Sequence, residues 1–416
     1  MDFAKSPEVS TQDVLPPRIL DPIEITSDLE RGFPQPAWLK TRERFTYTIK
    51  SAYLLLLVSI VFFGFDAFSR LRTKDSTSQG FSKPDNITIT GVVFYGRRQF
   101  VDVLDCYLRR NLVANGGYLD NVLFLQHTTN EHDLNWLDML VAEVPEYRSV
   151  TFPPFEGWGY GNLYSEMQQN NTIYVKLDDD LVWLEDDAIP HIVHTLIAHP
   201  EAHIVAGNII NAATTNWIHY HNGAVYPYLP EVEPHAEADT VVGASEWRTS
   251  KLPPYPAEIQ EPYDFSHEDA RDGTIPVGEP GGPPYKDHRW LPLERTSHNL
   301  FLTPIAAAAY NAYGRGWTSW AMGAQQLYSH LDNLEAGTLS KYWFGGEDGV
   351  WDMQYERYNI NFMAVWGSSI AMELPGKDDE GDLTTTIPKK FDRRESSCPP
   401  KQMDPTTDNV SCSCVS

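Results

Sequence analysis

The 416-residue sequence has few basic residues for its length. It contains 32 Lys and Arg against 57 Asp and Glu, which gives a formal net charge of −25. Because nucleic acid is bound through an excess of Lys and Arg, this balance excludes a surface that wraps nucleic acid. An anionic ligand then needs a local basic pocket or a bridging metal ion. With 42% hydrophobic residues, the chain can still bury at least one sizeable core.

Cysteines are also scarce, with four in the whole sequence. Three of them, Cys398, Cys412 and Cys414, lie together near the C-terminal end. Two of these three can form a disulfide, and the sequence leaves open which two. We expect Cys106 to lie buried in a helix.

Long hydrophobic runs are absent apart from one, Ser51–Phe65, which carries no charge. As a helix it spans about 22 Å, which is less than the roughly 30 Å of a bilayer core. Residues 45–68 together are long enough if Lys50 extends to the interface. A buried helix of a soluble domain and a cleaved signal peptide are the alternatives, but about fifty residues precede the run. The sequence therefore predicts a single transmembrane signal anchor at 45–68.

The residues around this run indicate how the chain is oriented. Residues 1–44 are rich in Pro and acids and predict a disordered cytosolic tail, and 69–85 predict a short polar stem. Basic residues are slightly more numerous before the run than after it. Glycosylation sequons support a luminal C-terminal part; they begin at Asn86, Asn170 and Asn409.

Strand and helix patterns alternate beyond the stem. Short β-branched or apolar runs predict strands at 87–95, 121–126, 148–152 and 172–177. Helical patterns separate them at 98–115, 132–144 and around 162–169. Strands joined by helices of this length require parallel crossovers. We therefore expect an α/β domain over 86–375.

The rest of that domain is less regular. A helix is expected at 187–200 and a strand at 202–210, before a Pro- and Gly-rich insert at 230–292. Further helices are expected at 303–314 and 319–337, and a last strand at 360–367. Residues 376–416 predict a flexible polar tail.

Three consecutive acids follow the fourth strand in "IYVKLDDD". Asp178, Asp179 and Asp180 can form a solvated turn, cap a helix or bind a cation. Ligands of α/β sheets collect at the carboxyl ends of parallel strands, where these acids lie. The strand runs into them without turn residues, which favours a binding site for Mn²⁺ or Mg²⁺.

The order of elements and the Asp-x-Asp motif resemble the nucleotide-binding half of GT-A glycosyltransferases. The resemblance covers about Asn86–Gly367, and "VKLDDD" is similar to the motif of type II Golgi transferases. Four further stretches are similar to a largely uncharacterised group of fungal type II membrane proteins: "NGAVYPYLPE", "HRWLP", "YSHLDNLEAG" and "VWDMQYERYNINFMAVWG". The resemblance to GT-A enzymes implies a GT-A-like (Rossmann-like), mostly parallel sheet flanked by helices. It also implies that the transmembrane helix precedes this domain and lies in the Golgi or ER membrane. It also implies that Asp178 and Asp180 hold the metal and that Asp178, Asp179 and Asp180 contact the donor diphosphate.

A second acidic stretch, "YWFGGEDGVWDMQYE", resembles the acceptor half of several GT-A families. The resemblance implies Glu347 or Asp348 as the catalytic base that deprotonates the acceptor hydroxyl. Gly349 stands where the fuller pattern has a further acid, so Asp352 or Glu356 are alternatives. The same residues are also typical of an acidic turn at the start of a helix, with Asp348 as the N-cap.

Two further candidates are weaker in pattern. His219 and His221 are two apart, hence on one face of a strand if extended, and His221 can complete the metal shell. The pattern favours the alternative, a pair of histidines packed among aromatic residues. Arg97 follows the first strand, where it can contact the nucleotide or remain solvated.

The sequence therefore favours a luminal, metal-dependent transferase. Its expected partners are a nucleotide-sugar donor, a glycan, glycoprotein or glycolipid acceptor, and the membrane. A catalytically silent, membrane-anchored carbohydrate-binding or scaffold protein is the alternative. A glycoside hydrolase is disfavoured because adjacent acids suit a cation better than two sides of a sugar bond.

Overall fold

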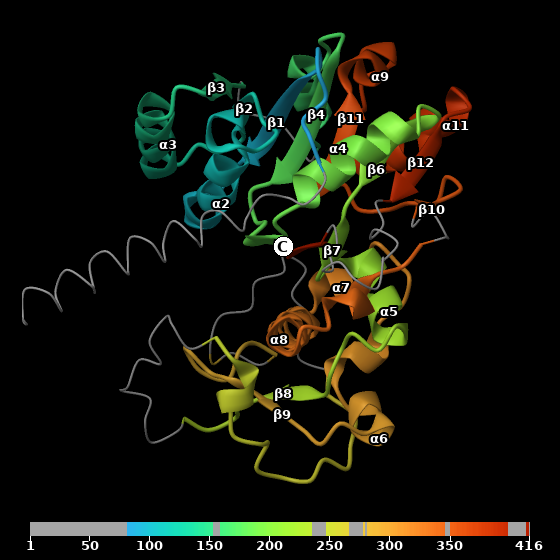
Figure 1. Cartoon of the computed structure of the whole chain (residues 1–416). Coiled ribbons are helices and arrows are strands. Elements are labelled where there is room, and N and C mark those ends of the chain that lie inside the picture. Colours follow the sequence, from blue (N-terminus) through green and yellow to red (C-terminus); the bar gives the residue numbers. More distant parts are fainter. Residues whose placement is uncertain are drawn as a thin grey trace, which may run out of the picture. The chain divides into compact units, whose positions relative to one another are not determined.

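The computed structural model describes residues 81–152, 159–234, 247–265, 278, 281–345, 350–393 and the backbone of 394–397 and 413–415 (Figure 1). These residues belong to one compact unit, Ser76–Ser416. The tail, the expected membrane segment 45–68 and most of the stem lie outside the described residues. Among the residues described, no helix combines the length and apolarity needed to cross a membrane.

A mixed sheet of eight strands dominates the described residues, in the order β10-β12-β6-β11-β4-β1-β2-β3. The four strands β3, β2, β1 and β4 are all parallel, whereas β11 runs antiparallel to both β4 and β6. The α/β class with a mostly parallel sheet is therefore confirmed. The strands are β1 (Thr88–Tyr95), β2 (Asn121–Gln126), β3 (Tyr147–Thr151), β4 (Thr172–Asp178), β6 (Ala202–Ala206), β10 (Trp351–Asp352), β11 (Phe362–Trp366) and β12 (Arg394–Ser397).

Helices cover both faces of this sheet (Figure 1). In β1, Val93 faces a core formed with α2 (Arg98–Asn111), α3 (Glu131–Glu143) and α4 (Ala188–Ala198). Its neighbour Val92 faces the other side, where it packs with η2 (Gly161–Glu166), α9 (Gly367–Met372) and η6 (Asp382–Thr386). Both faces of β1 are buried because side chains alternate along a strand and helices lie on each side.

The strand order reverses beside β1. The chain runs outward through β1, β2 and β3 and then returns to place β4 on the other side of β1. Such a reversal opens a crevice at the carboxyl ends of the two strands, where ligands of α/β sheets bind. Because Phe94 of β1 pairs with Asp178 of β4, the three acids lie at this crevice.

A second group of elements packs around one long helix, α8 (Trp320–Ala336), below the sheet in Figure 1. The helix begins with Ser319, whose side chain accepts a hydrogen bond from Met322 N at 3.1 Å, and ends at Gly337 with φ of 66°. This helix matches the expectation for 319–337. The other members are α5 (Ala213–His221), α6 (Ser297–Phe301), α7 (Arg315–Thr318), β7 (Asn208–Ile210), β8 (Tyr228–Pro230) and β9 (Trp290–Pro292).

The insert 230–292 is closed at its base by a two-stranded ribbon. Strand β8 enters it and β9 leaves it, with Leu229 opposite Leu291. Both leucines are buried. A small separate sheet joins β5 (Trp183–Leu184), β13 (Ser413–Val415) and β7.

Several local expectations differ from the structure. The helix expected over 303–314 is reduced to the short turn η4 (Pro304–Ala307), where Pro304 and Ile305 are the buried residues, so no apolar face extends further. The side chain of Cys106, expected to be buried, is exposed on α2.

The largest difference concerns the expected flexible tail, 376–416. Residues 379–397 form α10 (Asp379–Gly381), η6, α11 (Ile387–Lys390) and the sheet strand β12. Leu383 and Ile387 are buried and fasten this segment to the sheet, whereas polar residues around them hide the pattern in the sequence. Residues 398–412 lie outside the described residues.

Candidate functional site

Asp179 joins the ends of β1 and β4. Its side chain is 5% exposed, and its Oδ1 accepts hydrogen bonds from Arg97 Nη2 at 2.5 Å and Arg97 Nε at 3.2 Å. Its Oδ2 accepts from the backbone N–H of Gly96 at 2.9 Å. A Cβ on Gly96 would lie 3.1 Å from the same oxygen, so glycine allows this close approach. Asp179 therefore holds the turn after β1 in place.

Asp178 is neutralised within the protein. The ammonium group of Lys176, 2% exposed, donates to Asp178 Oδ1 and also to the carbonyl oxygen of Ile360 at 2.9 Å. Asn361 Nδ2 donates to Asp178 Oδ2 at 3.0 Å. Burial raises the pKa of Asp178 to about 7, and Lys176 opposes that rise. Both oxygens of this carboxylate therefore have partners in the chain.

The two carboxylate oxygens of Asp180 differ in their surroundings. Its Oδ2 accepts from Arg97 Nη2 at 3.0 Å. Its Oδ1 is buried and has no hydrogen-bond partner among the residues that the structure describes. A buried carboxylate oxygen without a partner is costly, which indicates that a ligand or ion completes it. Of the three acids, Asp180 is the one oriented for binding.

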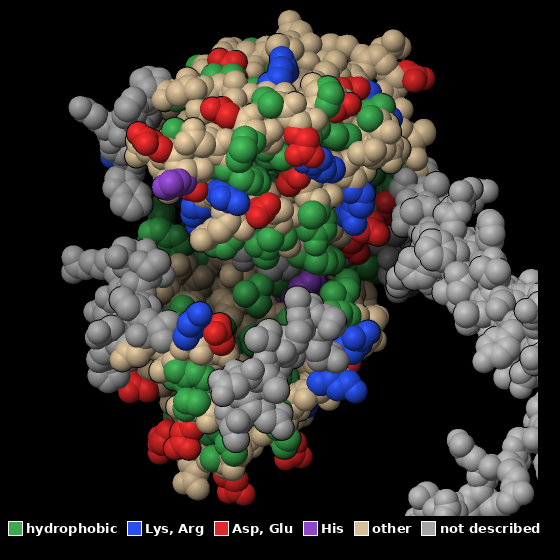
Figure 2. Space-filling view, turned by 90° about the vertical axis from the view of Figure 1, so that its left-hand side faces the viewer, with side chains coloured by type: hydrophobic (Ala, Val, Ile, Leu, Met, Phe, Trp, Pro, Cys, Tyr) green, Lys and Arg blue, Asp and Glu red, His purple; other side chains and the backbone are tan. Residues whose placement is uncertain are grey.

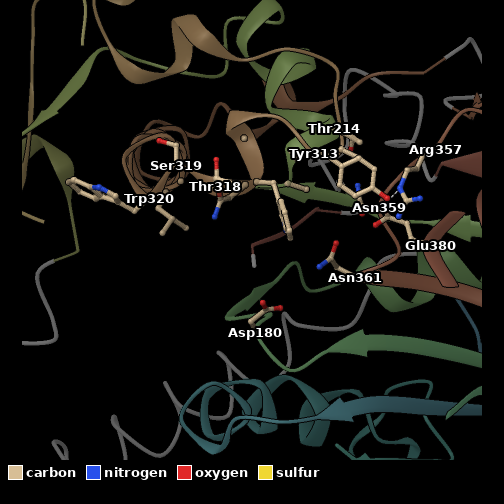
Figure 3. A pocket seen from close by; sticks show the side chains of 18 of the residues that line it. Asp180, Thr214, Tyr313, Thr318, Ser319, Trp320, Arg357, Asn359, Asn361 and Glu380 are labelled. Atoms are coloured by element: carbon tan, nitrogen blue, oxygen red, sulfur yellow. Dashed lines mark hydrogen bonds and ion pairs between the residues drawn. The ribbon is translucent and has the colours of Figure 1, made fainter. Parts of the chain in front are cut away.

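Two adjoining cavities open beside these acids. One has a volume of about 750 Å³ and the other of about 590 Å³, which is the size range of small-molecule sites. In Figure 3, Asp180 and Asn361 reach the larger cavity from the sheet, while Thr318 and Ser319 come from the junction of α7 and α8. Residues that line both cavities are Arg97, Asp180, Trp317, Asp379 and Glu380.

Asp379 and Glu380 are site residues that sequence reasoning missed. Tyr164 donates its hydroxyl to Asp379 Oδ2 at 3.0 Å, and Arg357 Nε donates to Glu380 Oε1 at 2.5 Å. Burial raises the pKa of each of these two carboxyl groups. The acidic run "KDDEGD", 377–382, was a visible signal, but it lay in a segment expected to be flexible.

Of the predicted site residues, the structure brings together Arg97, Asp178, Asp179 and Asp180. Glu347 and Asp348 lie outside the described residues. His221 lines neither cavity; it is exposed, and its Nδ1 lies 2.8 Å from the carbonyl oxygen of Trp217.

The strand geometry expected for the two histidines is wrong. Both belong to helix α5, where residues two apart point to different sides, so His219 is buried and His221 is exposed. His219 Nε2 instead forms a hydrogen bond with Asn208 Oδ1 at 2.8 Å. The two ring systems therefore cannot act together on one face.

The described residues fit a divalent cation in part. Carboxylate oxygens suit Mg²⁺ and Mn²⁺, and Asp180 Oδ1 has no other partner among the described residues. Asp178 would have to release Lys176 or Asn361 to bind as well. Within the described ranges, no group of three or more His, Cys, Asp and Glu has a geometry that could hold a metal. A cation here would therefore need further oxygens from a bound ligand or from water.

No protein-family model and no curated protein matches the sequence. Among solved structures, one that is similar to this chain is a mannosyltransferase from Pyrobaculum calidifontis in complex with GDP-Man and Mn²⁺. The alignment covers 36% of this chain and 45% of the mannosyltransferase chain, with 15% sequence identity and a TM-score of 0.25. Glucosyl-3-phosphoglycerate synthase from Mycobacterium tuberculosis matches 30% of this chain and 44% of its own at 16% identity, with a TM-score of 0.24.

A third structure, 4-diphosphocytidyl-2C-methyl-D-erythritol synthase from Anaerococcus prevotii, matches 30% of this chain and 56% of its own at 8% identity, with a TM-score of 0.24. The matched part thus spans roughly half the length of each of these proteins. Partial similarities of this extent assign the chain to no family.

Proposed function

We propose that this protein is a glycosyltransferase of the secretory pathway that uses a nucleotide-sugar donor and a divalent cation. The observation that carries the proposal is Asp180, a carboxylate with an unpartnered oxygen at the crevice where the strand order reverses. The Asp-x-Asp motif after β4 and its resemblance to GT-A enzymes support it.

In this proposal each residue at the crevice has a separate task. Asp180 binds the cation, which stabilises negative charge on the departing diphosphate when it is bound. Arg97, which Asp179 and Asp180 hold, presents a guanidinium toward the phosphates. Asp179 keeps Arg97 and Gly96 in position, and Lys176 balances the charge of Asp178.

A catalytically silent carbohydrate-binding or scaffold protein is the second candidate. One observation favours it: Asp178 and Asp179 are already neutralised by Lys176 and Arg97, which leaves Asp180 as the open carboxylate of the three. Such a site can bind a donor weakly without turning it over.

The test measures the thermal stability of the full-length chain with Mn²⁺ and a panel of UDP- and GDP-sugars. We expect at least one donor to raise Tm in the presence of Mn²⁺, and Asp180→Asn to remove this rise because the negative charge that attracts the cation is lost. Asp186→Asn is the matched control, since Asp186 is 70% exposed and pairs with Arg110 away from both cavities.

Transfer of sugar to water or to an acceptor, with release of the nucleotide, would separate the enzyme from the silent relative. Donor stabilisation that persists in Asp180→Asn, or the absence of stabilisation by any donor, would contradict the proposed role of the acid.

A further inference from the structure

The larger cavity has polar groups in its wall that lack hydrogen-bond partners. The side chain of Asn359 is 4% exposed, and neither its Nδ2 nor its Oδ1 forms a hydrogen bond within the described part of the chain. Thr214, at 3% exposure, likewise has an unpartnered Oγ1. Both residues line the cavity that Asp180 lines (Figure 3). Buried polar groups are nearly always satisfied, so these indicate a ligand that offers both donors and acceptors.

Two largely exposed aromatic rings line the same cavity, and the guanidinium of Arg357 lies over one of them, Tyr313, at 5.0 Å from the ring centroid. Tyr313 is 64% exposed and Trp317 is 60% exposed, with ring centroids 6.3 Å apart in an edge-to-face arrangement. Both line the larger cavity, and Trp317 lines the smaller one as well. Large aromatic rings are normally covered, and an exposed pair beside a cavity is suited to stack on an apolar ligand face.

Beside Arg357, the larger cavity does not favour an anionic ligand. Its described lining carries four carboxylates, Asp180, Asp378, Asp379 and Glu380, and two arginines. Arg97 is paired with Asp179 and Asp180, and Arg357 is paired with Asp378 at 2.7 Å and with Glu380 at 2.5 Å. Arg357, the guanidinium of this cavity that lies outside the proposed donor site, is therefore already neutralised and is not free to receive a carboxylate.

We propose that Asn359, Thr214 and the Tyr313–Trp317 pair form a subsite for a neutral sugar. Sugar hydroxyls both donate and accept, as the amide of Asn359 and the hydroxyl of Thr214 require. The C–H face of a pyranose ring covers the indole of Trp317. That this sugar is the acceptor of a transfer reaction rests on the proposed function, whereas its binding does not.

Binding is tested with the full-length chain in the absence of metal and nucleotide, by saturation-transfer NMR. The probes are the methyl glycosides of mannose, glucose and galactose, with sodium glucuronate as the anionic counterpart. We expect a saturation-transfer signal from at least one neutral glycoside. We expect glucuronate to bind at least about tenfold more weakly than that glycoside. No transfer to any neutral glycoside, or equal binding of glucuronate, overturns the proposal.

Two variants and a control locate the subsite. Asn359→Leu is nearly isosteric and removes both unpartnered groups, so it should fold normally and weaken glycoside binding about tenfold. Trp317→Ala should weaken it to a similar extent. Trp247→Ala, which removes a tryptophan that is 39% exposed and lines neither cavity, should leave binding unchanged. Unchanged binding in both cavity variants overturns the assignment.

The Mn²⁺-dependent donor assay separates this inference from the proposed function. If Asn359→Leu keeps donor stabilisation and loses glycoside binding, both stand. If wild type shows donor stabilisation but binds no glycoside, only the subsite is wrong; if it binds glycosides but no donor, the transferase is wrong and a carbohydrate-binding protein remains.

Discussion

Asp179 and Asp180 are neighbours in the chain but lie in different surroundings. Asp179 is buried with both oxygens bonded, whereas Asp180 keeps one buried oxygen that no other described residue bonds. A fully bonded carboxylate stabilises the fold, while an unpartnered one lowers stability and is retained where it binds something. Asp179 therefore has a structural role within the motif, and the proposed binding role falls to Asp180.

This difference predicts that the same substitution has a larger effect on stability at Asp179 than at Asp180. Asp179→Asn removes the charge that holds Arg97 and replaces one acceptor oxygen by a donor, so we expect a loss of about 1–3 kcal/mol in the free energy of unfolding. Asp180→Asn should change it by less than about 1 kcal/mol. Urea unfolding of both variants measures this. Equal losses in the two variants would show that the motif acts as one structural unit.

At the scale of elements, α5 and α8 each bury one histidine, and both imidazole rings lie edge-to-face against the ring of Tyr342. His219 and His330 are 0% and 3% exposed, and neither ring nitrogen of His330 has a hydrogen-bond partner among the described residues. Burial lowers the pKa of His219 to about 3 and that of His330 to about 4. Both rings are therefore neutral in the folded protein at physiological pH.

Because the folded pKa lies below the unfolded value, the unfolded chain binds more protons as pH falls through 6.5. Stability contributed by neutral His330 is present above pH 6.5 and is lost progressively toward pH 4. At pH 4.5 we expect the loss to be about 2 kcal/mol.

Carboxyl groups with raised pKa values, such as Asp379, add stability as the pH falls and so partly mask the loss from His330. Comparing wild type with His330→Phe separates the two effects. Urea unfolding at pH 7 and pH 4.5 should show a smaller loss in His330→Phe than in wild type. His132→Phe, at an exposed position of α3, should behave like wild type. An unchanged pH dependence in His330→Phe would mean that His330 is solvated in solution.

The sequence predicts where helices and strands lie along the chain better than it predicts which of them lie side by side in the fold. The strand at 121–126 and the helix at 319–337 agree with the structure because apolar periodicity reports a buried face directly. Periodicity does not report which strand lies alongside, so the antiparallel position of β11 between β4 and β6 could not be read from it.

The same limit applies to the site. Asp178–Asp180 and Arg97 were predicted because each follows a strand of one parallel set. Lys176 as an internal counter-ion, and Asp379 and Glu380 as cavity residues, depend on contacts between distant segments. The sequence motif names the acids, and the tertiary contacts decide which of them is free to bind.

At the scale of the whole molecule, the sequons bear on the predicted membrane topology. If residues 45–68 span the membrane with the C-terminal part in the lumen, Asn86 and Asn170 should carry N-linked glycans, since both are exposed. Peptide N-glycosidase should increase the mobility of the expressed chain, and Asn86→Gln or Asn170→Gln should each remove one step of that shift. A chain whose mobility does not change would contradict the luminal placement.

The position of β11 also has a consequence for how the protein is made. Strands β4 and β6 are not hydrogen-bonded to each other, because β11 lies between them. During synthesis, β6 therefore leaves the ribosome long before the strand that joins it to β4, and its edges stay open meanwhile. An exposed edge of this kind invites pairing with other chains. The nascent protein thus passes through a vulnerable interval in which one edge of β6 waits for Phe362–Trp366 and the other waits for Arg394–Ser397.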